Sequence, residues 1–248
     1  MIALLALLQA APGLAAQGLA ERFPAPPEPP VCSVTLNVSV DEAGDPPEQQ
    51  VYRYDAGADA WSYVSYNGGP PPEEEREQFE ERGRDGGDRS DEPVLPAAFY
   101  ADAAAKLGPG WTRLTEPDAY GMTLYGIEDL PKGTVVANGR DLSGYIRLRY
   151  LIDGSGPVPL IAVSGGQLKR DWRIPLIARI SAFDIERRFA PAEADTGAPG
   201  AMLPLSEHVE IAANILGRDR SAVIDTTFTD WDCAPGEALA EGPAEDAR

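Results

Sequence analysis

Histidine and cysteine are scarce in this chain of 248 residues, which has one His and two Cys. One His and two Cys cannot build a typical zinc site, so that chemistry is not indicated. In SEHVEIAANI, His208 alternates with Val209 and Ile211, which predicts an outward-facing strand position rather than a catalytic one. We therefore expect a protein that is not an enzyme and has no metal or cofactor, although a site made of carboxylates alone stays open.

No apolar run in the chain reaches the roughly 20 residues that a transmembrane helix needs, so we expect no transmembrane segment. The apolar run 2–8 is followed by small residues, a pattern typical of a secretory signal peptide. We expect residues 1–20 to be that signal, although its basic start is missing and an ordinary N-terminal helix is the alternative. The prediction that follows is a periplasmic or secreted protein.

Positive charge is also in short supply. Lys and Arg number 21 against 40 Asp and Glu, and the formal net charge is −19. The electric field of so negative a protein repels the phosphates of nucleic acids and anionic lipid surfaces. We therefore expect no nucleic-acid partner.

Cys32 and Cys233 are the only cysteines. In an exported protein an even pair predicts a disulfide, and two unrelated buried thiols are the alternative. The bond would close a loop of about 200 residues and contribute at most about 4 to 5 kcal/mol through the entropy of the unfolded chain. It would join the first strand of the fold to the last.

Period-two alternation predicts the strands. Val34, Leu36, Val38 and Val40 alternate with polar residues, and 51–55 with 61–66 read as a hairpin. After Trp111, six β-rich runs follow, separated by turn signals. They are DAYGMTLYGIE, SGYIRLRYLID, VPLIAVSGGQ, WRIPLIARISAFDIERRF, SEHVEIAANILG and SAVIDTTFTDWDC. Their length and short connections predict a strongly curved antiparallel meander.

Two short helices are expected between these groups of strands. Asn67 and Gly68 end a strand, and prolines 70–72 precede three glutamates that suit the first turn of a helix. Residues 96–107 predict a second helix with Leu95 and Phe99 on its apolar stripe. The loop between them carries Asp85, Asp88 and Asp91, but their spacing matches no ordered calcium loop such as the EF-hand pattern.

The predicted fold class is therefore α+β, mainly β: a strongly curved antiparallel sheet or unclosed β-barrel with two short covering helices. We expect one β-rich domain over 21–233, a helical cover at about 71–107, and a disordered tail over 234–248, which is rich in Ala, Gly, Pro and Glu.

The order of these elements resembles the lipoprotein-carrier superfamily of the periplasmic LolA and LolB type. The resemblance lies in VYRYDAGADAWSYVSYNGGPPPEEEREQF, DLSGYIRLRYLIDGSGPVPLIAVS, PLIARISAFDIERRFAP and MLPLSEHVEIAANILGRDRSAVIDTTFTDW. It implies an unclosed barrel with a helical lid that binds acyl chains or a lipidated protein without catalysis. The chain departs from that pattern in its first helix, which is strongly charged.

Two functions follow as hypotheses. The first is a non-catalytic exported protein that binds a hydrophobic ligand, such as an acyl chain, a lipid or a lipidated protein, in the concave face of the sheet. The second is a cell-envelope interaction module with a filled core, no ligand and an envelope protein as its partner. For the first we expect a lining of apolar side chains, each of which could instead be plain core: Leu95, Phe99, Leu148, Tyr150, Leu160, Ile174, Leu176, Ile180 and Ile211.

Overall fold

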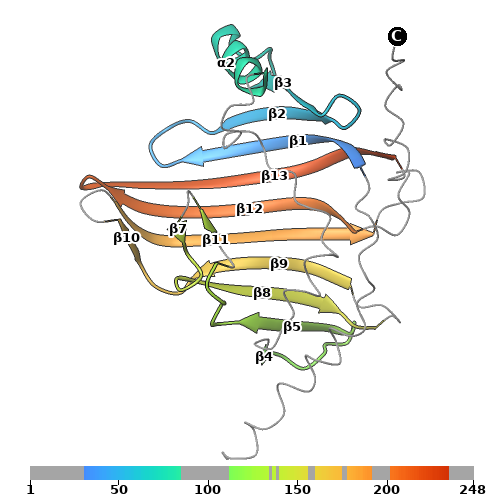
Figure 1. The fold of residues 1–248 in the computed structure, drawn as a ribbon, viewed down its shortest axis with the longest axis vertical. Helices are drawn as coiled ribbons and strands as arrows, with labels where there is room; N and C mark the ends of the chain where they lie inside the picture. Colours follow the sequence, from blue (N-terminus) through green and yellow to red (C-terminus); the bar gives the residue numbers. More distant parts are fainter. Residues whose placement is uncertain are drawn as a thin grey trace, which may run out of the picture.

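The protein is an open antiparallel sheet, as the computed structural model shows for residues 31–84, 112–133, 136–137, 140–155, 160–174, 178–191 and 202–234. Eleven strands form this sheet, and two more form a small hairpin (Figure 1). The strands are β1 Val31–Glu42, β2 Glu48–Asp55, β3 Ala60–Tyr66, β4 Thr112–Arg113, β5 Met122–Ile127, β6 Val136–Ala137, β7 Arg140–Asp141, β8 Ile146–Asp153, β9 Leu160–Leu168, β10 Trp172–Ile174, β11 Ala178–Pro191, β12 Met202–Ile215 and β13 Arg218–Ala234. The described helix is α2 Glu73–Arg84.

The strand order is β3-β2-β1-β13-β12-β11-β9-β8-β5-β4, with β10 paired to β11. The first and last strands of the described chain are therefore neighbours in the middle of the sheet, while β3 and β4 form its two edges. The edges lie at opposite ends of the molecule (Figure 1), so the sheet is not closed into a barrel. The predicted mainly β, unclosed antiparallel architecture is confirmed.

Alternation along each strand gives the sheet two chemically different faces. Directly opposed residues of neighbouring strands share a face, so the register places Leu36, Tyr150 and Ile185 on one side. We call this side the apolar face. The intervening residues, among them Arg149 and His208, lie on the other side, which we call the polar face.

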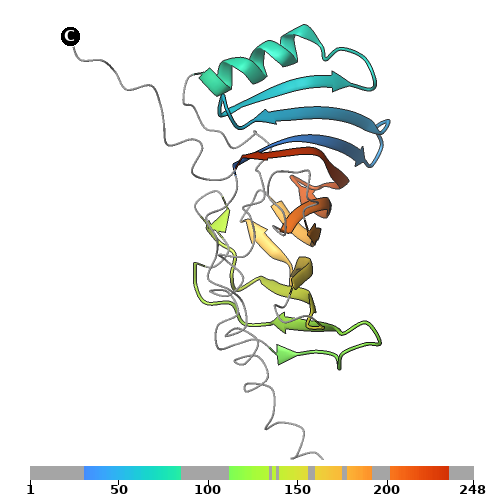
Figure 2. The ribbon, with the colours of Figure 1, turned by 90° about the vertical axis from the view of Figure 1, so that its right-hand side faces the viewer.

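The apolar face carries two hydrophobic clusters. The first cluster lies on β5, β8 and β9 and on the ends of β11 and β12, and contains Tyr125, Ile127, Tyr150, Ile152, Ile161, Phe189 and Met202. The second cluster, on β1 and β13, contains Val34, Leu36 and Phe228, with Tyr52, Tyr54, Trp61 and Trp231 packed against it. The connection from β5 to β8 leaves the plane of the sheet, and its Leu130 packs on the first cluster. Figure 2 shows the β6–β7 hairpin of this connection standing off one side of the sheet.

Helix α2 packs at the β3 edge. Asn67 and Gly68 have positive φ angles of 49° and 77°, which turn the chain out of β3 before the helix begins. The ring of Phe79 is buried, with its centroid 5.5 Å from that of Tyr52 and 6.0 Å from that of Tyr63. Burial raises the pKa of the Tyr63 hydroxyl above its usual range. α2 thus extends the sheet edge with an aromatic contact (Figure 2).

The predicted helical cover is only partly described. α2 confirms a helix after the proline run, with Glu73, Glu74 and Glu75 in its first turn. The predicted second helix at 96–107 lies outside the described residues, as do the signal segment 1–20 and residues 235–248 of the tail. The domain limits and the covering role of 71–107 therefore stay predictions.

One predicted run has a different structure from the one expected. WRIPLIARISAFDIERRF reads as one long strand, yet the structure has two antiparallel strands, β10 and β11, with Trp172 opposite Ile180. The run contains Pro175, which has no N–H to donate to a sheet ladder. Alternation of apolar residues continues on both sides of that position and therefore conceals the reversal.

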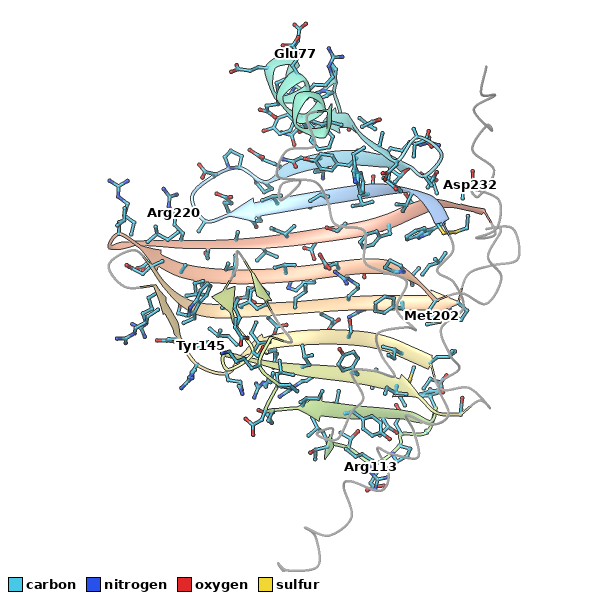
Figure 3. The ribbon with its side chains drawn as sticks, viewed as in Figure 1. Glu77, Arg113, Tyr145, Met202, Arg220 and Asp232 are labelled. Atoms are coloured by element: carbon cyan, nitrogen blue, oxygen red, sulfur yellow. A yellow bond between two sulfur atoms is a disulfide. The ribbon has the colours of Figure 1, made fainter. Side chains whose placement is uncertain are left out.

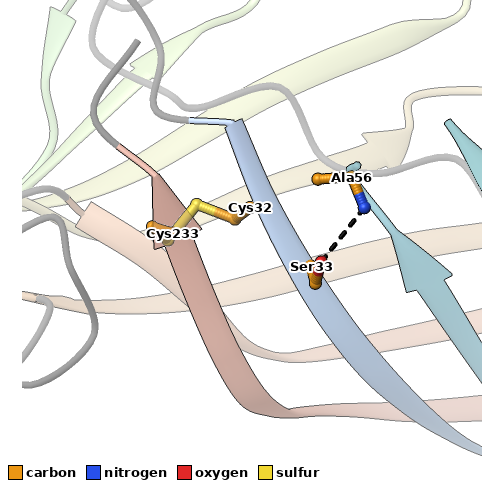
Figure 4. Close-up of a disulfide and its surroundings, with 4 residues drawn as sticks. All are labelled: Cys32, Ser33, Ala56 and Cys233. Carbon is orange, nitrogen blue, oxygen red and sulfur yellow. Dashed lines mark hydrogen bonds between the residues drawn. A yellow bond between two sulfur atoms is a disulfide. The ribbon is translucent and has the colours of Figure 1, made fainter. Parts of the chain in front are cut away.

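A disulfide joins β1 to β13. Cys32 and Cys233 are directly opposed, with Cα atoms 4.0 Å apart, and are 201 positions apart in sequence (Figure 4). Both cysteines are buried, and Leu203 and Trp231 pack beside them. One residue further along β1, Ser33 Oγ accepts a hydrogen bond of 3.0 Å from the Ala56 amide, which ties the β2–β3 turn to the same place.

Replacing both cysteines by serine is expected to lower the free energy of unfolding by about 2 to 5 kcal/mol, because the unfolded chain regains the entropy that the long loop removes. Urea unfolding followed by tryptophan fluorescence measures the change. The reduced wild-type protein is the control and should unfold at the midpoint of the variant. An unchanged midpoint in both would contradict a stabilising role for the bond.

Candidate functional site

Half-buried apolar side chains gather on β11 and β12, which lie between the two hydrophobic clusters. A β-carbon at Gly166 would lie 3.1 Å from Ile185 Cγ2 and 3.6 Å from Leu148 Cδ2, so these side chains converge above that glycine. Phe183 is opposite Ile211. We call the following group the apolar patch: Leu148, Ile180, Phe183, Ile185, Val209 and Ile211.

The sequence-predicted lining residues fall into three groups. Leu148, Ile180 and Ile211 belong to the apolar patch. Tyr150 is buried in the first cluster, and Leu160 packs against that cluster. Leu95, Phe99 and Leu176 lie outside the described residues; Ile174 is the last residue of β10, and only its backbone is described. The structure brings the first two groups to one face, and their role in binding stays a prediction.

A half-buried ion pair bounds the apolar patch. Arg187 and Glu207 are directly opposed on the apolar face, and Arg187 Nε donates a 2.8 Å hydrogen bond to Glu207 Oε2. Their side chains are 23% and 20% exposed. The pair separates Ile185 and Val209 from Phe189, so the patch ends at a charged boundary.

The polar face is hollowed into a cleft of about 640 Å³ over β5, β8, β9 and β11. Its apolar lining is Met122, Leu124, Leu151, Val163 and Ile185, and its charged lining is Glu116, Asp118, Arg149, Asp184, Glu186 and Arg188. One wall is the turn that follows β4, the short strand at the sheet edge that ends at Arg113 (Figure 3). We call this hollow the β8 cleft.

The carboxylates of the β8 cleft already have partners. Glu116 accepts a 2.7 Å hydrogen bond from Arg113, and Glu186 accepts one of 3.0 Å from Arg188. Asp118 Oδ1 accepts the amides of Tyr120 and Met122 at 2.8 and 2.9 Å, and Asp184 accepts the side-chain amide of Gln167. Arg149 differs from them, because its buried Nε has no hydrogen-bond partner in the part of the chain that the structure describes.

A second hollow of about 470 Å³ adjoins the β8 cleft over β11, β12 and β13. It contains His208, whose Nδ1 lies 2.7 Å from Asp225 Oδ1. The two side chains are 47% and 61% exposed, which agrees with the expected outward-facing strand position. The hydrogen bond to Asp225 raises the pKa of the His208 imidazole, and nearby carboxylates add to the shift while desolvation opposes it.

Metal binding has no support from the described part of the chain, where no three or more His, Cys, Asp or Glu side chains come together as ligands. Asp85, Asp88 and Asp91 lie outside that part. The described helix, moreover, is neither long nor apolar enough to cross a membrane.

Known proteins offer distant likenesses. No family model and no curated protein matches the chain. The structure of a DUF1329 family protein from Desulfovibrio piger is similar at a TM-score of 0.37, with 11% identity over 91% of this chain and 94% of that one. A LolA superfamily protein from Nitrosomonas europaea is similar at a TM-score of 0.34, with 10% identity over 90% and 94% of the two chains. The second bears the name of the superfamily that the strand pattern resembles. At these TM-scores neither likeness decides what is bound.

Sequence reasoning missed the β8 cleft. Its residues come from strands whose pairing is known only from the register. In the sequence, Arg149 is recognisable only as a residue on the charged side of one alternating strand. The available signal was a run of charged residues on alternating positions of both β8 and β11. Such runs are usually solvated faces, so the signal alone does not identify a cleft.

Because His208 is the only histidine, its titration can be followed without overlap. We expect the imidazole to titrate above its ordinary pKa, and Asp225→Asn to lower that pKa, since the variant removes the main hydrogen bond. The raised folded-state pKa stabilises the fold below the unfolded pKa, and this contribution disappears as pH rises through the folded pKa. For so exposed a pair it is at most about 1 kcal/mol.

NMR of the imidazole ring protons against pH measures this directly. Glu210→Gln, on the same strand and face, removes only a smaller charge contribution and should lower the pKa less than Asp225→Asn does. Equal pKa values in the wild type and the Asp225→Asn variant would show that the pair does not form in solution.

Proposed function

We propose that this protein is a non-catalytic, exported binding protein whose apolar face holds a hydrophobic ligand, such as an acyl chain, a lipid or the lipid group of a lipidated protein. The observation that carries the proposal is the apolar patch. Its side chains remain half-buried in the middle of the sheet, whereas Tyr150 and Ile152 of the first cluster are 4% and 1% exposed. A ligand that covered the patch would bury this remaining surface at about 25 cal/mol per Å².

The openness of the sheet supports the same proposal. A small closed barrel can fill its interior with its own side chains, while an unclosed sheet leaves one face to be covered by other elements or by a ligand. The strand order keeps β3 and β4 at opposite edges. The apolar face therefore cannot close on itself through strand pairing.

The chain connection between the two edges gives the ligand a potential cover. Residues 67–111 leave β3 at one edge and reach β4 at the other. Ten adjacent strands span about 43 Å at about 4.8 Å per spacing, a distance that this connection has to cross. The predicted helix with Leu95 and Phe99 belongs to this connection. The proposal therefore includes both side chains in the lining of the ligand.

The test is native mass spectrometry of the mature protein purified without denaturation, with lipid extraction of the same sample. We expect fatty acid or phospholipid to co-purify with the wild type. Replacing both Phe183 and Ile211 by glutamine should reduce the bound lipid about tenfold or more, because each burial is worth about 1.5 to 3 kcal/mol. Both side chains are half-buried, so the variant should still fold.

Glu210→Gln is the matched control, since Glu210 neighbours Ile211 on β12 but lies on the polar face, and it should retain the lipid. A wild-type protein that is folded and free of lipid would contradict the proposal and favour the alternative, an envelope interaction module with a filled core.

A further inference from the structure

Arg149 has no cross-strand side chain beside it. The register places Gly126 on one side of it and Gly165 on the other, both on the polar face. Glycine is disfavoured within strands and often marks a place where another group approaches closely. Leu114 approaches over Gly126, where a β-carbon would lie 2.9 Å from its Cδ1. On the other side, Glu186 of β11 is directly opposite Gly165 and provides the next side chain on the polar face.

The charged neighbours of Arg149 in the β8 cleft are engaged elsewhere. Glu186 is paired with Arg188, Glu116 with Arg113, and Asp184 with the amide of Gln167. Asp118 caps its own turn through backbone amides. Among the described residues, the buried Nε of Arg149 has no hydrogen-bond partner, whereas each of these four carboxylates has one. A buried donor without a partner costs about 1 to 3 kcal/mol, so the fold does not keep this arginine for its own stability.

The rest of the cleft limits what could bind there. Leu124, Leu151 and Val163 give it an apolar floor. A volume of about 640 Å³ lies within the range of small-molecule sites. The four carboxylates repel polyanions, so a ligand with one negative charge is favoured over a nucleotide or a polyphosphate.

We propose that the β8 cleft is a second binding site, for a monocarboxylate with an apolar group. The carboxylate meets the Arg149 guanidinium, and the apolar group lies on Leu124, Leu151 and Val163. Guanidinium and carboxylate match in shape and form charge-assisted hydrogen bonds. This site lies on the polar face, opposite the apolar patch, and therefore goes beyond the proposed function.

Octanoate is the probe, and isothermal titration calorimetry on the delipidated mature protein measures its affinity. We expect Arg149→Gln to weaken octanoate binding at least about tenfold, the loss of one hydrogen bond to a charged group. Acetate and 1-octanol, which lack the apolar group or the charge, should bind more weakly than octanoate. The unfolding midpoint of Arg149→Gln without ligand should stay close to that of the wild type, because the Nε of Arg149 has no hydrogen bond to a described residue that the substitution would break.

Two controls separate this site from its surroundings. Arg147→Gln changes an arginine on the same strand and face that is bonded to Gln167, and should leave octanoate affinity unchanged. Replacing Phe183 and Ile211 by glutamine changes two side chains of the apolar patch and should also leave the octanoate affinity unchanged. The proposal is overturned if octanoate does not bind the wild type, if Arg149→Gln binds it normally, or if only the patch variant loses it. The last result would leave the proposed function intact.

Discussion

The pairing of β1 with β13 holds the two parts of the sheet together. Strands β3, β2 and β1 form one meander, and β13 to β4 form a longer one. In the described part of the chain their strands pair along this ladder, which runs from Val31 opposite Ala234 to Glu42 opposite Ala222. Leu36 packs beside Phe228 on the apolar face, and the disulfide fixes the register at one end of the ladder. Without this contact the short meander would have no partner, and three strands with one apolar face are close to the smallest independently stable sheet.

Because the sheet is a single layer, each strand serves two faces at once. On β8, Leu148 and Tyr150 belong to the apolar face and Arg149, between them, to the polar face. Packing on one side therefore fixes the backbone that presents side chains on the other. The two proposed sites share strands β8 and β11, and Ile185 borders both of them. Phe183, Ile211 and Arg149 each belong to one site alone, which is why variants of these residues can address one face and leave the other unchanged.

Local chemistry made much of this fold predictable. Alternation in VTLNVSV located β1, and Asn67, Gly68 and three glutamates located the end of β3 and the start of α2. The even pair of cysteines predicted the contact between first and last strands. The reversal between β10 and β11 was not visible, because the apolar alternation continues across it. Nor was the β8 cleft, since Gly126, Arg149 and Gly165 come together through register, which depends on the whole sheet.

The position of Arg149 is set by the hydrophobic core. Tyr150 is 4% exposed and Leu148 packs against the first cluster, so the residue between them has little freedom to move out of the cleft. Preorganisation of this kind lowers the entropy lost when a ligand is ordered. The residues directly opposite Arg149 on both neighbouring strands are glycines, so neither of them offers it a carboxylate. Core packing on one face and the missing side chains on the other thus act together, and the buried Nε of Arg149 has no hydrogen-bond partner among the described residues.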